Sequence, residues 1–193
     1  GDHRDLHSFP TRRSSDLLPI SEATGSMVID IGGGTTEIAV MSLGGVVYSN
    51  SLRVAGDAMD GAFANYMRKE YNLMIGDSTA EKIKKEIGTA IATNNNTYAV
   101  KGRDLRSGTP KEVGITEEDS VEALNPILRE MINGIKDALE NTPPELSADL
   151  VDMGLTLTGG GALLKNIDKR LSKETGLPRS EEHTSELQSQ PDL

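Results

Sequence analysis

The chain has 193 residues, a length that suits one domain or two small ones and allows a substantial core. Its 30 acidic residues outnumber its 20 Lys and Arg, and the net charge of −10 argues against a nucleic-acid or anionic-membrane partner, because phosphate contacts need clustered cations. With 3% aromatic residues and no cysteine, the core must be aliphatic, and disulfides and thiol catalysis are excluded.

The two ends of the chain differ in composition from the rest. Residues 1–17 and 179–193 are polar and aperiodic, and they resemble in-frame translations of sequencing-adapter oligonucleotides. We therefore expect both to be non-native tails, with a natural disordered tail as the alternative. All three histidines lie in these tails, so His-based triads and zinc sites are excluded for residues 18–178. That segment starts without an initiator Met and is expected to be an internal piece of a longer protein.

The apolar patterns between the tails predict a mixed α/β protein. In chain order, the predicted elements are strands at 27–31, 38–42 and 46–54, helices at 57–71 and 79–87, strands at 97–105 and 110–115, a helix at 116–139, a strand at 153–158 and a helix at 162–173. Glycine-rich turns should join the first three strands in an antiparallel meander. Ser78 and Glu81 have the spacing of a capping box, and Pro143 and Pro144 should end the long helix.

The sharpest motif is the run DIGGGTTE, which begins at Asp30 between two apolar strands. Its glycines, Gly32, Gly33 and Gly34, allow positive φ angles and leave backbone N–H groups open, which is how a loop wraps a phosphate. Asp30 could hold Mg²⁺ through water, and Thr35 adds a hydroxyl at the same place. A strand follows and no Gly-Lys-Ser/Thr is present, so this is neither a Rossmann fingerprint nor a Walker loop. A plain hairpin turn is the alternative.

A second triple-glycine turn, formed by Gly159, Gly160 and Gly161, follows the strand predicted at 153–158 and precedes Ala162. Glycines at a strand-to-helix junction let a flat ring or a phosphate approach the N–H groups of a helix N-terminus. Taken alone, this motif is better explained as a tight turn between a strand and a helix, with a structural role only. Two such turns, each directly after an apolar strand, suggest two walls of one nucleotide site.

The third candidate is the run Glu81, Lys82, Ile83 and Lys84 on the second predicted helix. Ile83 is expected to face the core, which leaves Glu81 on the polar side, where its carboxylate could accept hydrogen bonds from ribose hydroxyls. The simpler alternative is that Glu81 completes the capping box and that the lysines form a solvated helix face.

Taken in order, these stretches resemble the MreB family of bacterial actin homologues over essentially all of residues 18–178. The likeness is carried by SEATGSMVIDIGGGTTEIAVMSLGGVVYS, GDSTAEKIKKEIG, PPEL and LTLTGGGALLKNID. The resemblance implies an α/β fold of the actin-like ATPase type, with a ribonuclease-H-like core. The phosphate-loop pattern alone would also fit an Hsp70-type chaperone or another actin-superfamily ATPase, and a non-catalytic interaction module is the remaining alternative.

The resemblance also implies roles for the motif residues. Asp30 and Thr35 would be the catalytic positions, with Asp30 on the Mg²⁺ side, and residues 32–35 would contact the phosphates of ATP. Residues 81–84 would line the ribose side, and residues 159–162 would flank the adenine. The chemistry would be phosphoryl transfer to water, in which positioning and electrostatics carry most of the catalysis.

On this resemblance the chain is the second lobe of a two-lobed ATPase. A ribonuclease-H-like subdomain would comprise residues 26–56 and 121–178, with a small inserted α+β subdomain at 57–120. The first phosphate loop, the residue that orients the attacking water and the membrane-binding element would belong to the other lobe, so the chain alone is expected to be inactive. The whole protein would be a cytoplasmic filament of identical subunits that organises the cell-wall elongation machinery at the inner face of the membrane and so governs rod cell shape.

Overall fold

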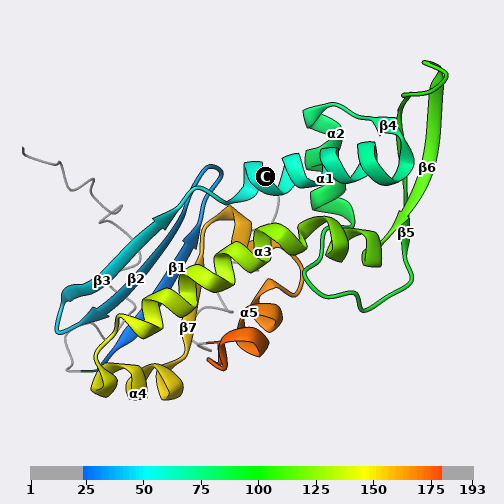
Figure 1. The fold of residues 1–193 in the computed structure, drawn as a ribbon. Coiled ribbons are helices and arrows are strands. Elements are labelled where there is room, and N and C mark those ends of the chain that lie inside the picture. Colours follow the sequence, from blue (N-terminus) through cyan, green and yellow to red (C-terminus); the bar gives the residue numbers. More distant parts are fainter. Residues whose placement is uncertain (1–23, 180–193) are drawn as a thin grey trace, which may run out of the picture.

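The computed structural model describes residues 24–179, so the predicted tails lie outside the described residues except for Arg179. The elements are, in order, β1 (Ser26–Ile31), β2 (Thr36–Ser42), β3 (Gly45–Leu52), α1 (Gly56–Tyr71), β4 (Leu73–Met74), α2 (Asp77–Glu86), β5 (Thr97–Asp104), β6 (Pro110–Thr116), α3 (Glu117–Glu140), α4 (Pro144–Met153), β7 (Leu155–Thr158), the 3-10 helix η1 (Gly160–Leu163) and α5 (Ile167–Thr175). Figure 1 shows α3 crossing the four-stranded sheet, with α1, α2 and a smaller sheet at the other end of the molecule. The mixed α/β class is confirmed.

The larger sheet has the strand order β3-β2-β1-β7. Strands β1, β2 and β3 form the predicted antiparallel meander, whereas β7 pairs with β1 in parallel. Asp30 therefore lies opposite Glu37 on one side and Thr158 on the other. Because parallel strands end at the same edge of a sheet, this pairing brings the glycines that follow β1 and those that follow β7 together.

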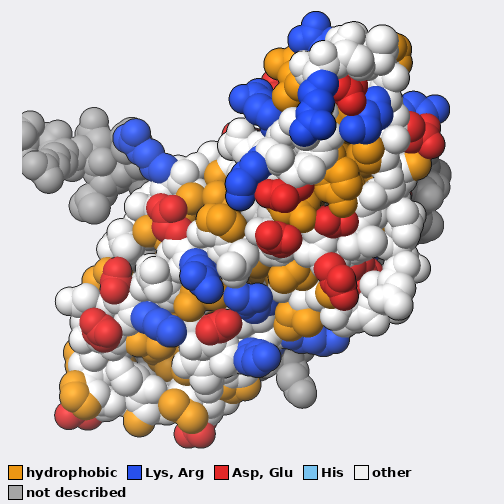
Figure 2. All heavy atoms as spheres, turned by 45° about the vertical axis from the view of Figure 1, so that its right-hand side comes forward, with side chains coloured by type: hydrophobic (Ala, Val, Ile, Leu, Met, Phe, Trp, Pro, Cys, Tyr) orange, Lys and Arg blue, Asp and Glu red, His pale blue; other side chains and the backbone are white. Residues whose placement is uncertain are grey.

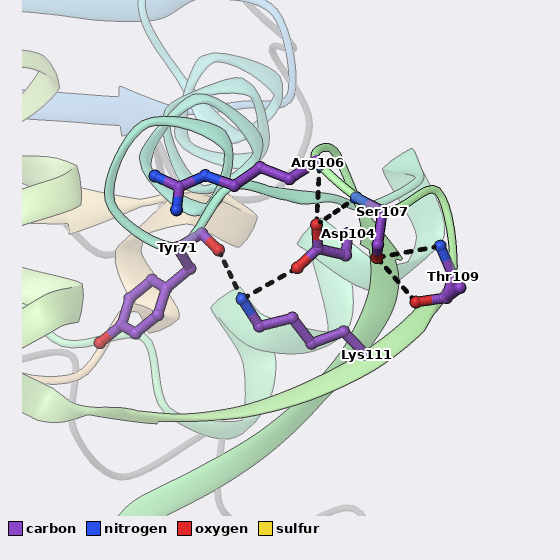
Figure 3. A network of polar contacts seen from close by, with 6 residues as sticks. All are labelled: Tyr71, Asp104, Arg106, Ser107, Thr109 and Lys111. Atoms are coloured by element: carbon purple, nitrogen blue, oxygen red, sulfur yellow. Dashed lines mark hydrogen bonds and ion pairs between the residues drawn. The ribbon is translucent and has the colours of Figure 1, made fainter.

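The smaller sheet has the order β4-β5-β6, and β5 and β6 form the predicted hairpin. The Asp104 carboxylate organises its turn (Figure 3), accepting hydrogen bonds from the backbone N–H groups of Ser107 at 3.0 Å and Arg106 at 2.7 Å. These bonds lower the pKa of Asp104 to about 2, although its burial acts in the opposite direction. Lys111 lies 3.3 Å from the same carboxylate and donates to the backbone oxygen of Tyr71, which ties the hairpin to the end of α1.

The core is aliphatic, as the composition predicts, whereas the face shown in Figure 2 carries Lys, Arg, Asp and Glu side chains between smaller hydrophobic areas. The buried face of α1 carries Met59, Phe63 and Met67, and α3 buries Leu124 and Leu128 completely. The helical spacing of these apolar residues explains both helices. None of the helices within residues 24–179 combines the length and the apolar character that crossing a bilayer requires.

The capping box predicted at Ser78 and Glu81 is wrong. Helix α2 begins two residues earlier than predicted, at Asp77, and its N-cap is Gly76, which has no side chain to accept a hydrogen bond. Ser78 therefore lies inside the first turn. Glu81 instead pairs with Lys85, one helical turn later, at 2.6 Å.

The single helix predicted at 162–173 is also wrong. The chain forms the short η1 directly after Gly159, and α5 begins only at Ile167, because Asn166 takes a left-handed conformation with φ of 59° that interrupts the helical hydrogen bonds. Helix α4 is absent from the prediction. Pro143 and Pro144 end α3 as expected, but a proline also suits the first position of a helix, and Pro144 begins α4.

Candidate functional site

The glycine loop after β1 is held against the N-terminus of α1. The N–H of Gly56 donates to the carbonyl oxygen of Gly32 at 3.0 Å, and the N–H of Asp57 donates to that of Gly33 at 2.8 Å. The residue before α1, Ala55, has no capping side chain, so these loop carbonyls satisfy two N–H groups that the helix itself leaves unpaired. Gly33, Gly34 and Thr35 remain exposed. The loop is fixed on one side and open on the other.

The second glycine turn packs against the end of β1. Gly159 has φ of 83°, and a Cβ atom there would collide with the Asp30 carboxylate and the carbonyl oxygen of Ile31. A Cβ atom at Gly161 would collide with the Ile31 side chain, whereas one at Gly160 would meet no atom within 4 Å. Glycine is therefore required on both sides of Gly160 for close packing, and Gly160 itself faces open space.

Helix α2 contributes a lysine to the same region. Nζ of Lys84 lies 2.9 Å from Oδ2 of Asp60 and donates to the backbone oxygen of Gly56 at 3.1 Å. Both side chains of the ion pair are about 20% exposed (Lys84 21%, Asp60 20%), so the pair is largely shielded from water. Lys84 thus lies beside the residue that holds the first glycine loop.

These segments enclose one pocket of about 430 Å³. It is lined by residues from both glycine turns, the start of α1, the end of α2 and the segment after η1: Gly32, Gly33, Gly56, Asp57, Met59, Lys84, Lys85, Gly88, Gly160, Gly161, Leu163, Leu164 and Lys165. Three lysines and one aspartate supply the charged lining. Lys84 is paired with Asp60 and Lys85 with Glu81, so the pocket offers an anionic ligand individual ammonium groups and not a large net positive charge. Leu163 is 73% exposed and supplies an apolar surface at the rim.

The structure brings together five of the predicted site residues, at least one from each motif. Gly32, Gly33, Lys84, Gly160 and Gly161 line the pocket. Two glycine turns from distant parts of the sequence do share one cavity. The ligand contacts assigned to these residues stay predictions.

The other predicted residues do not line the pocket: Asp30, Gly34, Thr35, Glu81, Lys82, Ile83, Gly159 and Ala162. Ile83 is completely buried in the core, as its apolar spacing predicts, and Lys82 is exposed. The hydrogen bond from Lys85 lowers the pKa of Glu81, and the same bond raises the pKa of Lys85. Glu81 is therefore a carboxylate engaged with its neighbour on the helix surface.

Several lining residues escape the sequence patterns. Asp57 lies in the first turn of α1, where an acidic residue is common, so the sequence does not indicate that it belongs to the pocket. In the structure its Oδ1 atom lies 3.5 Å from the position that a Cβ atom at Gly33 would occupy. The sequence indicates Lys165 only weakly, as a cation that directly follows the GGGALL run. The isolated bridge between Thr89 and Lys165, which places Lys165 beside the end of α2, has no local signal.

A magnesium ion fits this site if a ligand brings phosphates with it. Within residues 24–179, no group of three His, Cys, Asp or Glu side chains comes together to hold a metal by itself. Mg²⁺ is commonly bound by one or two carboxylates plus substrate phosphates and water. Asp57 provides one such carboxylate at the pocket wall. The carboxylate of Asp30 does not line the pocket and lies beside Gly159, so it could act on the ion only through water.

Comparison with known proteins identifies close relatives of the chain. A family profile described as MreB/Mbl protein matches residues 16–186. The chain is 51% identical over 162 residues to the cell shape-determining protein MreB of Escherichia coli (strain K12), covering 83% of this chain and 47% of the relative. It is 43% identical to the cell shape-determining protein Mbl of Bacillus subtilis (strain 168), covering 83% and 49%. The chain spans about half the length of the curated relatives it matches.

Solved structures that resemble this fold include a protein of the same family as these relatives. MreB5 of Spiroplasma citri bound to AMPPNP superposes with a TM-score of 0.81 and 41% sequence identity, over 84% of this chain and 49% of that one. A non-polymerising MamK mutant bound to AMPPNP superposes with a TM-score of 0.64 and 20% identity, over 77% and 45%, a likeness of fold alone. Together these matches support the MreB interpretation over the Hsp70-type chaperone alternative.

Proposed function

The chain belongs to the MreB/Mbl family, and on this premise we propose that it is an ATP-binding lobe of a filament-forming protein that determines cell shape. One observation carries the proposal. Glycine turns that follow the parallel strands β1 and β7 line a single pocket together with three lysines. Open backbone N–H groups and cations are the groups that bind phosphates, and the pocket volume of about 430 Å³ lies in the range of small-ligand sites.

We assign the ends of the ligand from the chemistry of the two walls. The phosphates would lie by Gly33 and Lys84, where a backbone amide and an ammonium group line the pocket. The N–H of Gly32 already donates to the carbonyl oxygen of Thr35 at 2.9 Å. We assign Lys84 to the phosphates instead of the ribose side that the resemblance implies. The adenine would lie by Gly160 and Leu163, where the wall has little side-chain bulk and an exposed apolar surface. Glu81, which lies just outside the pocket lining, would reach the ribose only after separating from Lys85.

We assign Mg²⁺ to Asp30, whose carboxylate lies at the end of β1 beside Gly159. When bound, the ion would neutralise phosphate charge. Asp30 would hold it through water, and Thr35 would contribute its exposed hydroxyl. Hydrolysis is not expected from this chain alone, because the family resemblance assigns the residue that orients water to the other lobe.

For the whole protein we propose self-association into filaments, contact with the cell-wall elongation machinery and a place at the inner face of the membrane. The relatives named as cell shape-determining proteins support the role in cell shape, and a related structure described as a MamK double helical filament supports polymerisation by this fold.

Calorimetric titration with ATP tests the proposed site. We expect saturable binding to the 193-residue chain that is stronger with Mg²⁺ than with a chelator, and a smaller difference in the Asp30→Asn variant. Gly160→Val should weaken ATP binding at least about tenfold, because a side chain there meets no protein atom within 4 Å and would extend into the pocket.

The matched control is Gly61→Val, on α1 away from the pocket lining. A Cβ atom at Gly61 also meets no atom within 4 Å, so both variants should fold and only Gly160→Val should lose affinity. Unchanged ATP binding by Gly160→Val would refute the assignment of this pocket.

A further inference from the structure

Asp60 is a half-buried acidic partner of the pocket lysine Lys84, and no sequence motif identifies it. It lies on α1, and its Oδ2 atom is 2.9 Å from Nζ of Lys84. The two side chains are only 20% and 21% exposed, whereas those of the neighbouring Glu81 and Lys85 pair are 49% and 66% exposed. Shielding from water strengthens the attraction within the Asp60 pair relative to the surface pair.

Lys84 uses two of its three ammonium donors within the described residues. One reaches Asp60 and the second reaches the backbone oxygen of Gly56 at 3.1 Å. A lysine ammonium has three donors, so one is left to bind a ligand oxygen in the pocket that Lys84 lines. A free lysine would lose much rotamer freedom on binding, and this arrangement has ordered the side chain beforehand.

The same turn of α1 also holds the glycine loop. The N–H groups of Gly56 and Asp57 donate to the carbonyls of Gly32 and Gly33, and Asp60 follows one turn later. The helix therefore sets the position of the Lys84 ammonium relative to the loop amides. Oδ1 of Asp60 is buried and has no hydrogen-bond partner among the described residues, so the contacts of this carboxylate are directed to Lys84.

We propose that Asp60 is a positioning residue that holds Lys84 ready to bind the phosphates of a nucleotide. This rests on the proposed function of the pocket. Asp60 lies outside the pocket lining and acts through Lys84, so its contribution to binding should disappear when the ammonium group is removed.

A double-mutant cycle with MgATP as the probe tests this role in the 193-residue chain. Asp60→Asn keeps the shape of the side chain and removes its charge. It should weaken MgATP binding about tenfold when Lys84 is present and less than about twofold in the Lys84→Met background. A merely structural role would weaken binding equally in both backgrounds, and equal losses would overturn the proposal.

Two further measurements isolate the effect. Asp104→Asn, which removes an Asp–Lys pair far from the pocket, should leave MgATP affinity unchanged. Without ligand, the ¹H–¹⁵N signal of the Lys84 ammonium should be visible because its protons are hydrogen-bonded, and it should vanish in Asp60→Asn. An unchanged ammonium signal and an unchanged affinity would overturn the proposal.

The outcomes also separate the two proposals. No MgATP binding by the unsubstituted chain would refute the nucleotide pocket and, with it, the role of Asp60. MgATP binding that is sensitive to Gly160→Val but insensitive to Asp60→Asn would overturn the role of Asp60 alone.

Discussion

The carboxylate of Asp119 joins three elements, and we expect Asp119→Ala to lower the free energy of unfolding by about 3 kcal/mol. Oδ1 accepts hydrogen bonds from the hydroxyls of Tyr66 and Tyr71 on α1, at 2.8 and 3.0 Å. Oδ2 accepts from the backbone N–H of Thr116 at 2.7 Å and from its hydroxyl at 3.0 Å. Thr116 in turn accepts from the N–H of Asp119, which completes a capping box at the start of α3.

The magnitude follows from the two sets of bonds. A capping interaction contributes about 1 kcal/mol. A buried hydrogen bond to a charged group contributes about 1.5–3 kcal/mol, but both tyrosines are partly exposed and Tyr66 also donates to Glu122 at 3.1 Å. We therefore assign about 1 kcal/mol to each tyrosine bond. Burial raises the pKa values of both tyrosine hydroxyls, and their hydrogen bonds with Asp119 raise these pKa values further.

Guanidinium denaturation followed by circular dichroism measures this loss, with Tyr66→Phe and Tyr71→Phe as partial variants that should each lose about 1 kcal/mol. Burial alone would raise the pKa of Asp119, but the bonds from Thr116, Tyr66 and Tyr71 outweigh it and lower that pKa. Its stabilisation is therefore complete above the unfolded pKa of about 3.9 and is lost as pH falls through the lower folded value. A loss below about 1 kcal/mol at neutral pH would refute the reasoning.

Three further outcomes are expected. Gly159→Ala should destabilise the chain by at least about 2 kcal/mol in the same denaturation assay, because of its positive φ and its contact with β1, whereas Gly160→Ala should cost under about 0.5 kcal/mol. Glu117→Ala should lower the free energy of unfolding by about 2 kcal/mol. It should also accelerate amide exchange at Thr93 and Asn94, whose backbone N–H groups donate to the Glu117 carboxylate at 2.7 and 2.9 Å. NMR titration of Asp104 should give a midpoint near 2, and the hairpin stabilisation it provides should be present above pH about 4 and lost as pH falls through about 2. A midpoint near 4 would mean that its turn hydrogen bonds do not form.

Much of the fold could be predicted because it depends on residues that are close in the chain. The meander of β1, β2 and β3 follows from β-branched runs and glycine turns. The α3 helix follows from its apolar period and from Thr116 at its N-cap. The wrong predictions concern places where the residue pattern is ambiguous. The helix predicted at 162–173 is interrupted at Asn166, and no apolar periodicity indicates the left-handed conformation of that residue.

Local residue patterns identify the components of the candidate site, which are two triple-glycine turns after apolar strands and a lysine on a short helix. That the two turns meet is a hypothesis from the sequence. The contact itself depends on the parallel pairing of β1 with β7, two strands that are more than 120 residues apart in the chain, and this pairing places both turns at one pocket. Only the tertiary structure decided that Asp60 and Gly56 hold Lys84. Such contacts arise from packing between distant segments, and a local pattern of residues carries no information about which segments will meet.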